Sequence, residues 1–479
     1  MIGFEFKAHP LMFFKIIKPY IFVLFLPFLR AIVQYLTIGK TSGTMFLEFV
    51  AIFVISVIAF FGYKSIKISV KGNRVTIKRG FLIKGEVSID ISHISSISTK
   101  QNLLDLLFGS VSCFINTEAG RPKKDDFNLK LYKKDAKILC ILVNGSEKVK
   151  KISFSTFRIA LLAAGTSSVL TGMIIAVPVV KKTGDIINVA LTDLLLEQMS
   201  DISLKIDNYL PSFVNYVTVF FVFAYMASFV ITFFKRVKFR LIVGKKTIEI
   251  ESGLITRKNI IFKKSKINNI CFEQTFLMRI LKKYSMSVSV AGYGNKKGER
   301  ATVVPIGNKN SIKNQAKAIY GAFDYYANKI VPKQNLASLK NFLFVPMMIF
   351  LALITTVTVL LLVFPHVRRF ILLFSFITLC FNLYYASICY YDYKHSFVCF
   401  SDVILASASK KLSVQELCCS KNKVGVIKIT QTPADKRRKT CKTKITVCSE
   451  SADSARVKHI DLKSVIEGIN RTYDVKINV

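Results

Sequence analysis

Apolar stretches of membrane-spanning length alternate along the chain with charged segments the size of domains. Four of these stretches lack Asp, Glu, Lys and Arg entirely, and two others carry one such residue each. A helix of about 20 residues crosses the roughly 30 Å hydrocarbon core of a bilayer. The pattern therefore predicts six transmembrane helices, at residues 19–38, 44–63, 159–180, 211–234, 341–367 and 370–391.

The distribution of charge predicts how these helices are oriented. Nearly all of the formal net charge of +40 lies in the three charged segments, and the loops inside the helix pairs are close to neutral. Because basic residues near helix ends are retained on the cytoplasmic side, we expect a multi-pass protein of the cell membrane with both termini in the cytoplasm. The predicted order is a cytoplasmic segment at 1–18, hairpins at 19–63, 152–234 (outer loop 181–210) and 336–391, and cytoplasmic domains at 64–151, 235–335 and 392–479.

The three charged domains share one sequence register. Placing Gln101, Gln274 and Gln431 in one column aligns apolar residues four, seven and fourteen positions earlier without a gap. The same alignment places Gly80 over Gly253, twenty-one positions before the glutamine. Polar and apolar positions that agree in one register indicate duplication, so the chain contains an internal repeat.

Alternation of apolar and polar residues inside each copy predicts β-strands. Residues 67–78 alternate around Gly72–Asn73, which is typical of a β-hairpin. Several short antiparallel strands closed by one amphipathic helix predict a small barrel or roll. Further hairpins are expected at 239–250 and 396–405, further strands at 111–117 and 286–290, and closing helices at 134–142, 311–326 and 462–471.

The order of these features resembles a known family. The first domain reads RGFLIKGEVSIDISHISSISTKQNLLDLLFG from Arg79 to Gly109, followed by an alternating strand that leads to Ala119–Gly120 and then by a helix. It is similar to the membrane-anchored bacterial pleckstrin-homology (PH) domain family, the YdbS/YdbT-like proteins, whose long form has three PH-like domains, each after a helix pair. The resemblance implies a PH-like fold, a partly open barrel of about seven strands capped by a helix, without known catalytic residues. The third domain departs most, with Lys410 at the glycine position.

Basic residues form clusters on the predicted domains. Near an anionic leaflet each Lys or Arg contributes about 1 kcal/mol of binding free energy, and Arg can hold a phosphate through two hydrogen bonds. The alternative is that the clusters are solvated faces that follow the positive-inside bias. Nucleic acid is not expected as a partner, because aromatic residues are not interleaved with the basic ones. The candidate headgroup or partner contacts are Lys78, Arg79, Lys84, Lys258, Lys263, Lys264, Lys266, Lys282, Lys283, Lys436, Arg437, Arg438 and Lys439.

Two charges fall inside predicted spans. Arg30 and Glu48 lie on either side of the first predicted helix turn, so they are candidates for an intramembrane ion pair. The alternative is a place in an ion pathway, since charges inside a membrane are costly and often functional.

No catalytic, metal-binding or cofactor-binding motif is evident. The histidines are scattered, and the cysteines lack zinc-type spacing. We therefore expect a non-enzymatic, membrane-anchored PH-domain protein, without cofactor or metal, that mediates protein–protein or anionic-lipid interactions at the inner face of the bacterial cytoplasmic membrane. Its expected partners are the bilayer, anionic phospholipids, other membrane proteins and further copies of itself. The alternative is an accessory or core subunit of a membrane transport or export system.

Overall fold

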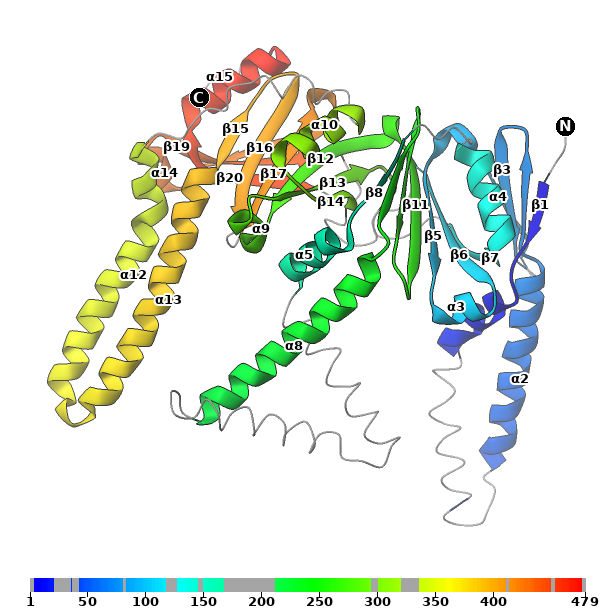
Figure 1. The fold of residues 1–479 in the computed structure, drawn as a ribbon, viewed down its shortest axis with the longest axis horizontal. Helices are drawn as coiled ribbons and strands as arrows, with labels where there is room; N and C mark the ends of the chain where they lie inside the picture. The colour runs from blue at the N-terminus through cyan, green and yellow to red at the C-terminus, as the bar shows by residue number, and fades with distance from the viewer. Residues whose placement is uncertain are drawn as a thin grey trace. The chain divides into compact units, whose positions relative to one another are not determined.

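The computed structural model describes residues 4–20, 36, 43–80, 83–117, 127–144, 150–167, 212–293, 300–319, 336–410, 413–448 and 453–475. Its elements divide into two compact units. The first unit comprises residues 1–152, 240–266 and 291–295, and the second comprises residues 153–239, 267–290 and 296–479. Each unit combines antiparallel sheets with helices (Figure 1).

One order of elements occurs three times. The first copy consists of β2 (Lys67–Lys71), β3 (Arg74–Arg79), β4 (Gly85–Asp90), η1 (Ile91–His93), β5 (Ile94–Gln101), α3 (Leu103–Leu107), β6 (Ser110–Thr117), β7 (Phe127–Tyr132) and α4 (Lys133–Asn144). The second consists of β9 (Arg240–Val243), β10 (Thr247–Ser252), β11 (Arg257–Lys263), η2 (Lys264–Lys266), β12 (Ile267–Gln274), α9 (Phe276–Ile280), β13 (Tyr284–Val290), β14 (Ala301–Gly307) and α10 (Lys309–Ile319). The third consists of β15 (Phe397–Cys399), β16 (Val403–Lys410), β17 (Ser413–Ser420), η4 (Lys421–Lys423), β18 (Val424–Thr430), α14 (Pro433–Arg437), β19 (Thr440–Val447), β20 (Ser454–Asp461) and α15 (Leu462–Tyr473). The hairpins and closing helices expected from the sequence are thus present in every copy.

The aligned glutamines make the same hydrogen bond in every copy. Each glutamine lies at the end of a strand or directly after it. Its Nε2 donates to the backbone carbonyl oxygen of the residue nine positions later, which lies at or directly before the start of the strand after the short helix. The bond therefore closes the loop that contains the short helix. The pairs are Gln101 with Ser110 at 2.9 Å, Gln274 with Lys283 at 3.1 Å, and Gln431 with Thr440 at 2.8 Å.

The backbone conformation explains why glycine occurs at the aligned positions 80 and 253. Gly80 and Gly253 have φ angles of +106° and +96°, which residues with a side chain rarely adopt. A Cβ added to Gly80 would lie 2.0 Å from the carbonyl oxygen of Ile83. The turn after β3 therefore requires glycine for both its backbone angle and its space.

The sheets do not coincide with the repeats. In the first unit, β1 (Phe4–Lys7), β2, β3 and β4 form one sheet, and a second has the order β7-β6-β5-β11-β10-β9-β8, where β8 is Lys150–Ser153. In the second unit, one sheet has the order β14-β13-β12-β17-β16-β15, and β18, β19 and β20 form another. Each repeat is therefore divided between two sheets, and consecutive repeats share a sheet. Strand β1 adds four residues of the segment 1–18 to the first sheet through its pairing with β2.

The closing helices cover the cores through their apolar faces. In the first copy Leu139 of α4 is fully buried with Ile68, Ile97 and Leu131 of the sheets. In the third copy Val465 and Ile469 of α15 pack with Cys441. Each closing helix thus contributes one apolar stripe to its core, as its periodicity predicts.

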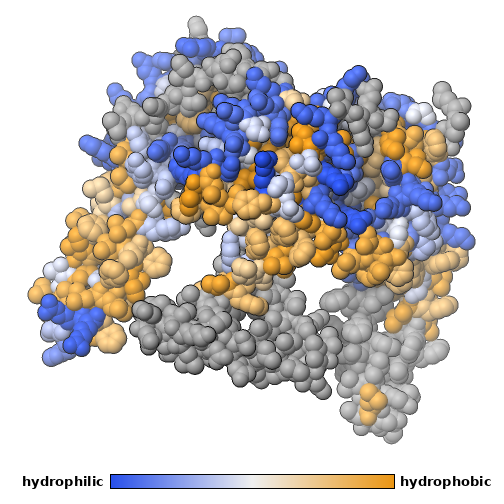
Figure 2. All heavy atoms as spheres, in the orientation of Figure 1, coloured by the Kyte–Doolittle hydropathy of each residue, from blue (hydrophilic) through white to orange (hydrophobic). Residues whose placement is uncertain are grey.

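Two described helices are long and apolar enough to cross a membrane. They are residues 338–363 within α12 (Leu336–Val363), and residues 365–395, which contain α13 (Arg368–His395). Both expose most of their large hydrophobic side chains, and Figure 2 shows this hydrophobic surface on the α12–α13 hairpin. Helices α2 (Gly43–Lys64) and α8 (Ser212–Arg236) occupy two more of the predicted spans.

The remaining two predicted spans differ from expectation or lie outside the described residues. Helix α5 (Thr156–Thr166) ends where Ser167 becomes extended, so the span predicted at 159–180 is not one helix from its start. Leu162 of α5 is buried against Met278 and Ile306 of the second repeat. Hydropathy correctly identified residues 159–180 as apolar, but the described part of this segment packs against the second repeat instead of facing lipid. Most of residues 19–38 lie outside the described residues, as does Arg30.

Candidate functional site

A short helix follows the aligned glutamine in each repeat, and we refer to α3, α9 and α14 as the post-glutamine helices. Two of them carry an aspartate at their third position, and its carboxylate accepts from the backbone N–H of the residue before the helix. Asp105 accepts from the N–H of Asn102 at 3.2 Å, and Asp435 accepts from the N–H of Thr432 at 3.2 Å. Such capping boxes satisfy amide groups that otherwise lack a partner.

The three helices end at one equivalent, left-handed residue. A left-handed residue after the last turn stops a helix and is most often glycine. The first repeat has glycine there, and the other two have lysine. These residues are Gly109, Lys282 and Lys439, with φ angles of +67°, +52° and +52°.

The first two post-glutamine helices expose large apolar side chains. Around α3 nearly every side chain except the buried Asp105 is apolar and exposed, and Leu107 reaches 78% exposure. Around α9 the same property is weaker. The exposed apolar residues are Leu103, Leu104, Leu106, Leu107 and Phe108 around α3, and Phe276, Ile280 and Leu281 around α9. Apolar clusters of this kind on a protein surface usually mark contacts with proteins or membranes.

The third post-glutamine helix is cationic instead. Helix α14 and the two residues after it expose Lys436, Arg437, Arg438 and Lys439. The second repeat is intermediate, because Lys282 directly follows its apolar residues. The three copies therefore place an apolar, a mixed and a cationic surface at one structural position.

The first two post-glutamine helices each contact a residue at the end of a helix that continues into, or contains, a predicted membrane span. His9, just before the helical residues 11–20, donates from Nε2 to the carbonyl oxygen of Phe108 at 3.1 Å. In the second unit Arg279 of α9 contacts His395, the last residue of α13, and its guanidinium lies 4.2 Å from the centre of the Tyr391 ring.

Helix α14 lies beside the first turns of α12 (Figure 1). Arg438 donates to the side-chain oxygen of Asn341 at 2.6 Å. Its guanidinium also lies 5.1 Å from the centre of the Phe344 ring. All three post-glutamine helices are therefore placed where an apolar helix meets a β-domain.

Buried carboxylates hold two of these helices to their domains. Burial alone would raise the pKa of Asp105, but hydrogen bonds from Lys130 and Ser110 hold the pKa below its ordinary value. Asp435 occupies the same position in the third repeat, and burial would likewise raise its pKa. Hydrogen bonds from Thr432 and from His459, at 2.9 Å, lower it instead. Within the described residues no cluster of His, Cys, Asp and Glu has a geometry that could hold a metal.

The predicted basic contacts separate into two groups. Lys282, Lys283, Lys436, Arg437, Arg438 and Lys439 lie on or just after post-glutamine helices. The others lie on strands and turns away from these helices in the repeat: Lys78 and Arg79 on β3, Lys84 before β4, Lys258 and Lys263 on β11, and Lys264 and Lys266 in η2.

Several residues of the second group have local partners. Lys78 pairs with Glu86 at 3.1 Å. Lys258 donates to the Tyr293 hydroxyl at 2.9 Å. Lys263 donates to the carbonyl oxygen of Ile91 at 2.5 Å, and burial lowers the pKa of Lys264. These contacts give part of the second group a structural role.

The exposed apolar side chains of the post-glutamine helices were not predicted from the sequence. Its available signal was the run from Asn102 to Gly109, in which every residue between the ends is apolar except Asp105. No single buried face can accept four leucines within five helical positions, so some of them must face outward.

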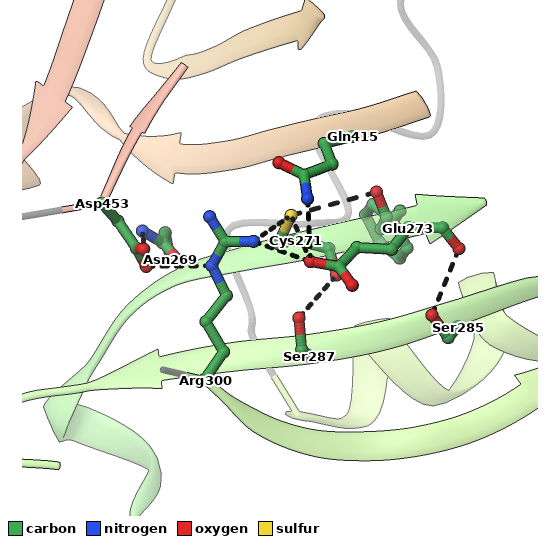
Figure 3. Close-up of polar contacts among 9 residues, drawn as sticks. Asn269, Cys271, Glu273, Ser285, Ser287, Arg300, Gln415 and Asp453 are labelled. Carbon is green, nitrogen blue, oxygen red and sulfur yellow. Dashed lines mark hydrogen bonds and ion pairs between the residues drawn. The ribbon is translucent and has the colours of Figure 1, made fainter. Parts of the chain in front are cut away.

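A buried ionic network joins the second and third repeats inside the second unit (Figure 3). Arg300 donates to Asp453 at 3.1 Å and to Glu273 at 2.8 Å. Asn269 also donates to Asp453, at 3.3 Å, and burial raises the pKa of the neighbouring Cys271 thiol. The side chain of Asp453 is 1% exposed and that of Arg300 is 11% exposed. Arg300 thus supplies one cation to a carboxylate from each of the two repeats, and the network spans their junction.

Comparison with known proteins identifies the family to which this chain belongs. The family model described as Bacterial PH domain matches residues 21–139 and 191–319. Searches of curated proteins and of solved structures gave no match. The two matched segments together cover more than half of the chain, which therefore belongs to the bacterial PH domain family.

Proposed function

We propose that this chain is a non-enzymatic, membrane-anchored PH-domain protein whose domains bind anionic lipid and protein partners at the inner face of the bacterial cytoplasmic membrane. PH domains are typically interaction modules that bind lipids or proteins. The proposal places hairpins of membrane-spanning segments before the domains at 64–151, 235–335 and 392–479, with α5 outside the membrane and both termini in the cytoplasm. Its main support is the position and composition of the post-glutamine helices.

Apolar and cationic residues at helix ends suit the interface of a bilayer. Transferring a Leu or Phe side chain from water to apolar surroundings stabilises by about 1.5–3 kcal/mol. Lys and Arg near anionic headgroups add about 1 kcal/mol each. In this proposal α3 and α9 insert apolar side chains, and α14 contacts headgroup phosphates. Because the domains are tethered to one another, weak contacts at each helix would reinforce one another.

The alternative of a transport subunit has less support. One buried polar side chain of the α12–α13 hairpin joins its two helices, because Asn382 of α13 donates to the carbonyl oxygen of Pro346 in α12 at 3.3 Å. The proposed ion pair of Arg30 with Glu48 remains a prediction. Arg30→Leu should lower the membrane-inserted yield, and adding Glu48→Leu should restore it if the two charges pair.

The insertion of α3 can be measured directly in the full chain. The exposed thiols Cys380 and Cys448 are replaced by Ser, and a fluorophore is attached to Leu107→Cys in nanodiscs that contain brominated lipid. We expect strong quenching at this position. The matched control is Ile138→Cys on α4, which is also apolar and exposed but lies on the closing helix. Equal quenching at the two positions would contradict insertion of the post-glutamine helix.

The headgroup contact of α14 needs a second measurement. We would replace Lys436, Arg437 and Lys439 with Gln and measure recruitment of a labelled anionic lipid to the full chain in detergent micelles. We expect recruitment to fall and to depend on salt up to about 0.3 M, where screening is strong. The matched control replaces three exposed lysines of α4: Lys133, Lys134 and Lys137. An equal fall in lipid recruitment in both variants would mean that recruitment depends only on net charge. No fall in either variant would favour protein partners for this surface.

A further inference from the structure

Consecutive repeats are joined twice by the same pair of strands. Strand β11 of the second repeat pairs antiparallel with β5 of the first, and β17 of the third pairs antiparallel with β12 of the second. The register is also the same. Gln101 faces Arg257, which lies 17 positions before Gln274, and Gln274 faces Val414, which lies 17 positions before Gln431. The repeat therefore carries two complementary edges, one on its third strand and one on its fourth.

Two edges of this kind are left over at the ends of the series. Among the described residues β4, the third strand of the first repeat, pairs only with β3, and β18, the fourth strand of the third repeat, pairs only with β19. Their side chains are correspondingly exposed. Val87 of β4 is 37% exposed, whereas Ile260 and Leu417 at the same repeat position are 5% and 2% exposed.

Strand β18 shows the same contrast. Val426 is 59% exposed, whereas Ser96 and Asn269 at the same repeat position are 1% and 0% exposed. All three strands also carry the same register shift, which in β18 lies between Val424 and Val426. Strand β18 is therefore built like β5 and β12, but no strand of the described part of the chain pairs with its other edge. An open strand edge with an exposed apolar residue is a template for pairing with another strand.

We propose that β4 of one copy of this chain pairs antiparallel with β18 of a second copy. The occupant is a second copy because the repeat itself supplies the complementary strand at both internal junctions. Carrying their register over places Gly85 opposite Thr430, Val87 opposite Lys428 and Ile89 opposite Val426. The interface is head-to-tail, so it forms rings where the rotation closes and filaments where it does not. It rests on strand edges and is independent of the lipid contacts proposed above.

Cysteine crosslinking between two differently tagged full-length chains tests the pairing. Both chains carry Ser at Cys380 and Cys448; one carries Gly85→Cys and the other Thr430→Cys. Opposed residues of antiparallel strands have Cα atoms about 4.5–5.5 Å apart, which a disulfide can span. Among the described residues, a Cβ on Gly85 would lie closest to the carbonyl oxygen of Arg79, at an ordinary contact distance of 3.7 Å, so the substitution is accommodated. We expect mild oxidation of the membranes to give a mixed-tag species of twice the chain mass.

Matched controls come from the internal junction and from a shifted register. Lys258→Cys with Lys100→Cys in one chain occupies the equivalent opposed pair, and its crosslink shows that the chain is folded and oxidised. Glu86→Cys mixed with Thr430→Cys places the thiols on opposite faces and should not crosslink. The same is expected when Val426→Lys is added to the chain with Thr430→Cys, because a charge on the edge opposes pairing. A positive internal control without any mixed-tag species would overturn the proposal, as would a crosslink confined to single chains that carry both Gly85→Cys and Thr430→Cys.

Discussion

Arg300 and Asp453 lie in different repeats, yet the guanidinium Nε of Arg300 is 3.1 Å from a carboxylate oxygen of Asp453. Removing one partner of a buried ion pair leaves an uncompensated charge and costs about 3–5 kcal/mol. Arg300→Met should therefore destabilise the junction between the second and third repeats. We expect a clear fall in the thermal unfolding midpoint in detergent and faster hydrogen exchange in β12 and β17.

The double variant Arg300→Met with Asp453→Asn distinguishes this mechanism from lost packing. It removes both charges, so it should recover part of the stability that Arg300→Met loses. Glu273 is 35% exposed and can be solvated without its partner. A double variant as unstable as the sum of both single variants would indicate that the charges do not interact.

The aligned glutamines should differ in their contribution to stability, although their hydrogen bonds are alike. Gln101 and Gln274 are each 7% exposed, whereas Gln431 is exposed. Replacing a buried glutamine with Leu leaves its carbonyl partner unsatisfied and costs about 1–3 kcal/mol. We expect that loss for Gln101→Leu and Gln274→Leu and a smaller one for Gln431→Leu, measured by thermal unfolding. Equal losses at all three positions would show that water does not replace the bond at Gln431.

The repeat could be predicted because the glutamine that defines its register performs one local task in every copy. The sharing of sheets between repeats could not be predicted. Strand β5 pairs with β11, as where Ile97 faces Ile261, and these strands are far apart in the sequence. Alternation of apolar and polar residues predicts which face of a strand is buried, but it does not predict which strand lies beside it. Hydropathy likewise predicted spans by residue type. It identified α12 and α13, but it assigned Leu162, which is buried against Met278, to a span. The basic clusters were identified from residue type alone. The sequence therefore did not distinguish Lys258, which lies on strand β11, from Lys436, which lies on helix α14.

Lys439 should be replaceable by glycine with a gain in stability. A left-handed conformation costs a residue with a side chain about 1–2 kcal/mol, and the first repeat has Gly109 at this position. Lys439→Gly should therefore raise the unfolding midpoint of the third repeat. The matched variant Lys436→Gly removes the same charge from inside helix α14, where glycine costs about 1 kcal/mol, so it should lower the midpoint. Changes of the same sign in both variants would show that charge, and not backbone conformation, controls the stability.

Acidification should loosen the third repeat through His459. Burial lowers the pKa of this histidine below its ordinary value of 6.5, and its Nδ1 donates to Asp435 while Lys442 and Lys458 disfavour a second positive charge. Above pH 6.5 the imidazole is neutral in the folded and unfolded states, so its contribution to stability is fully present. As the pH falls below that value the unfolded chain takes up the proton first, and stability declines until the folded pKa is passed. Hydrogen exchange, corrected for intrinsic rates, should therefore show less protection in β19 and β20 at about pH 5.5 than at about pH 7.5. His459→Asn keeps a donor for Asp435 and tolerates the φ angle of +52°, so it should remove most of this difference. An unchanged pH response in this variant would exclude His459 as its source.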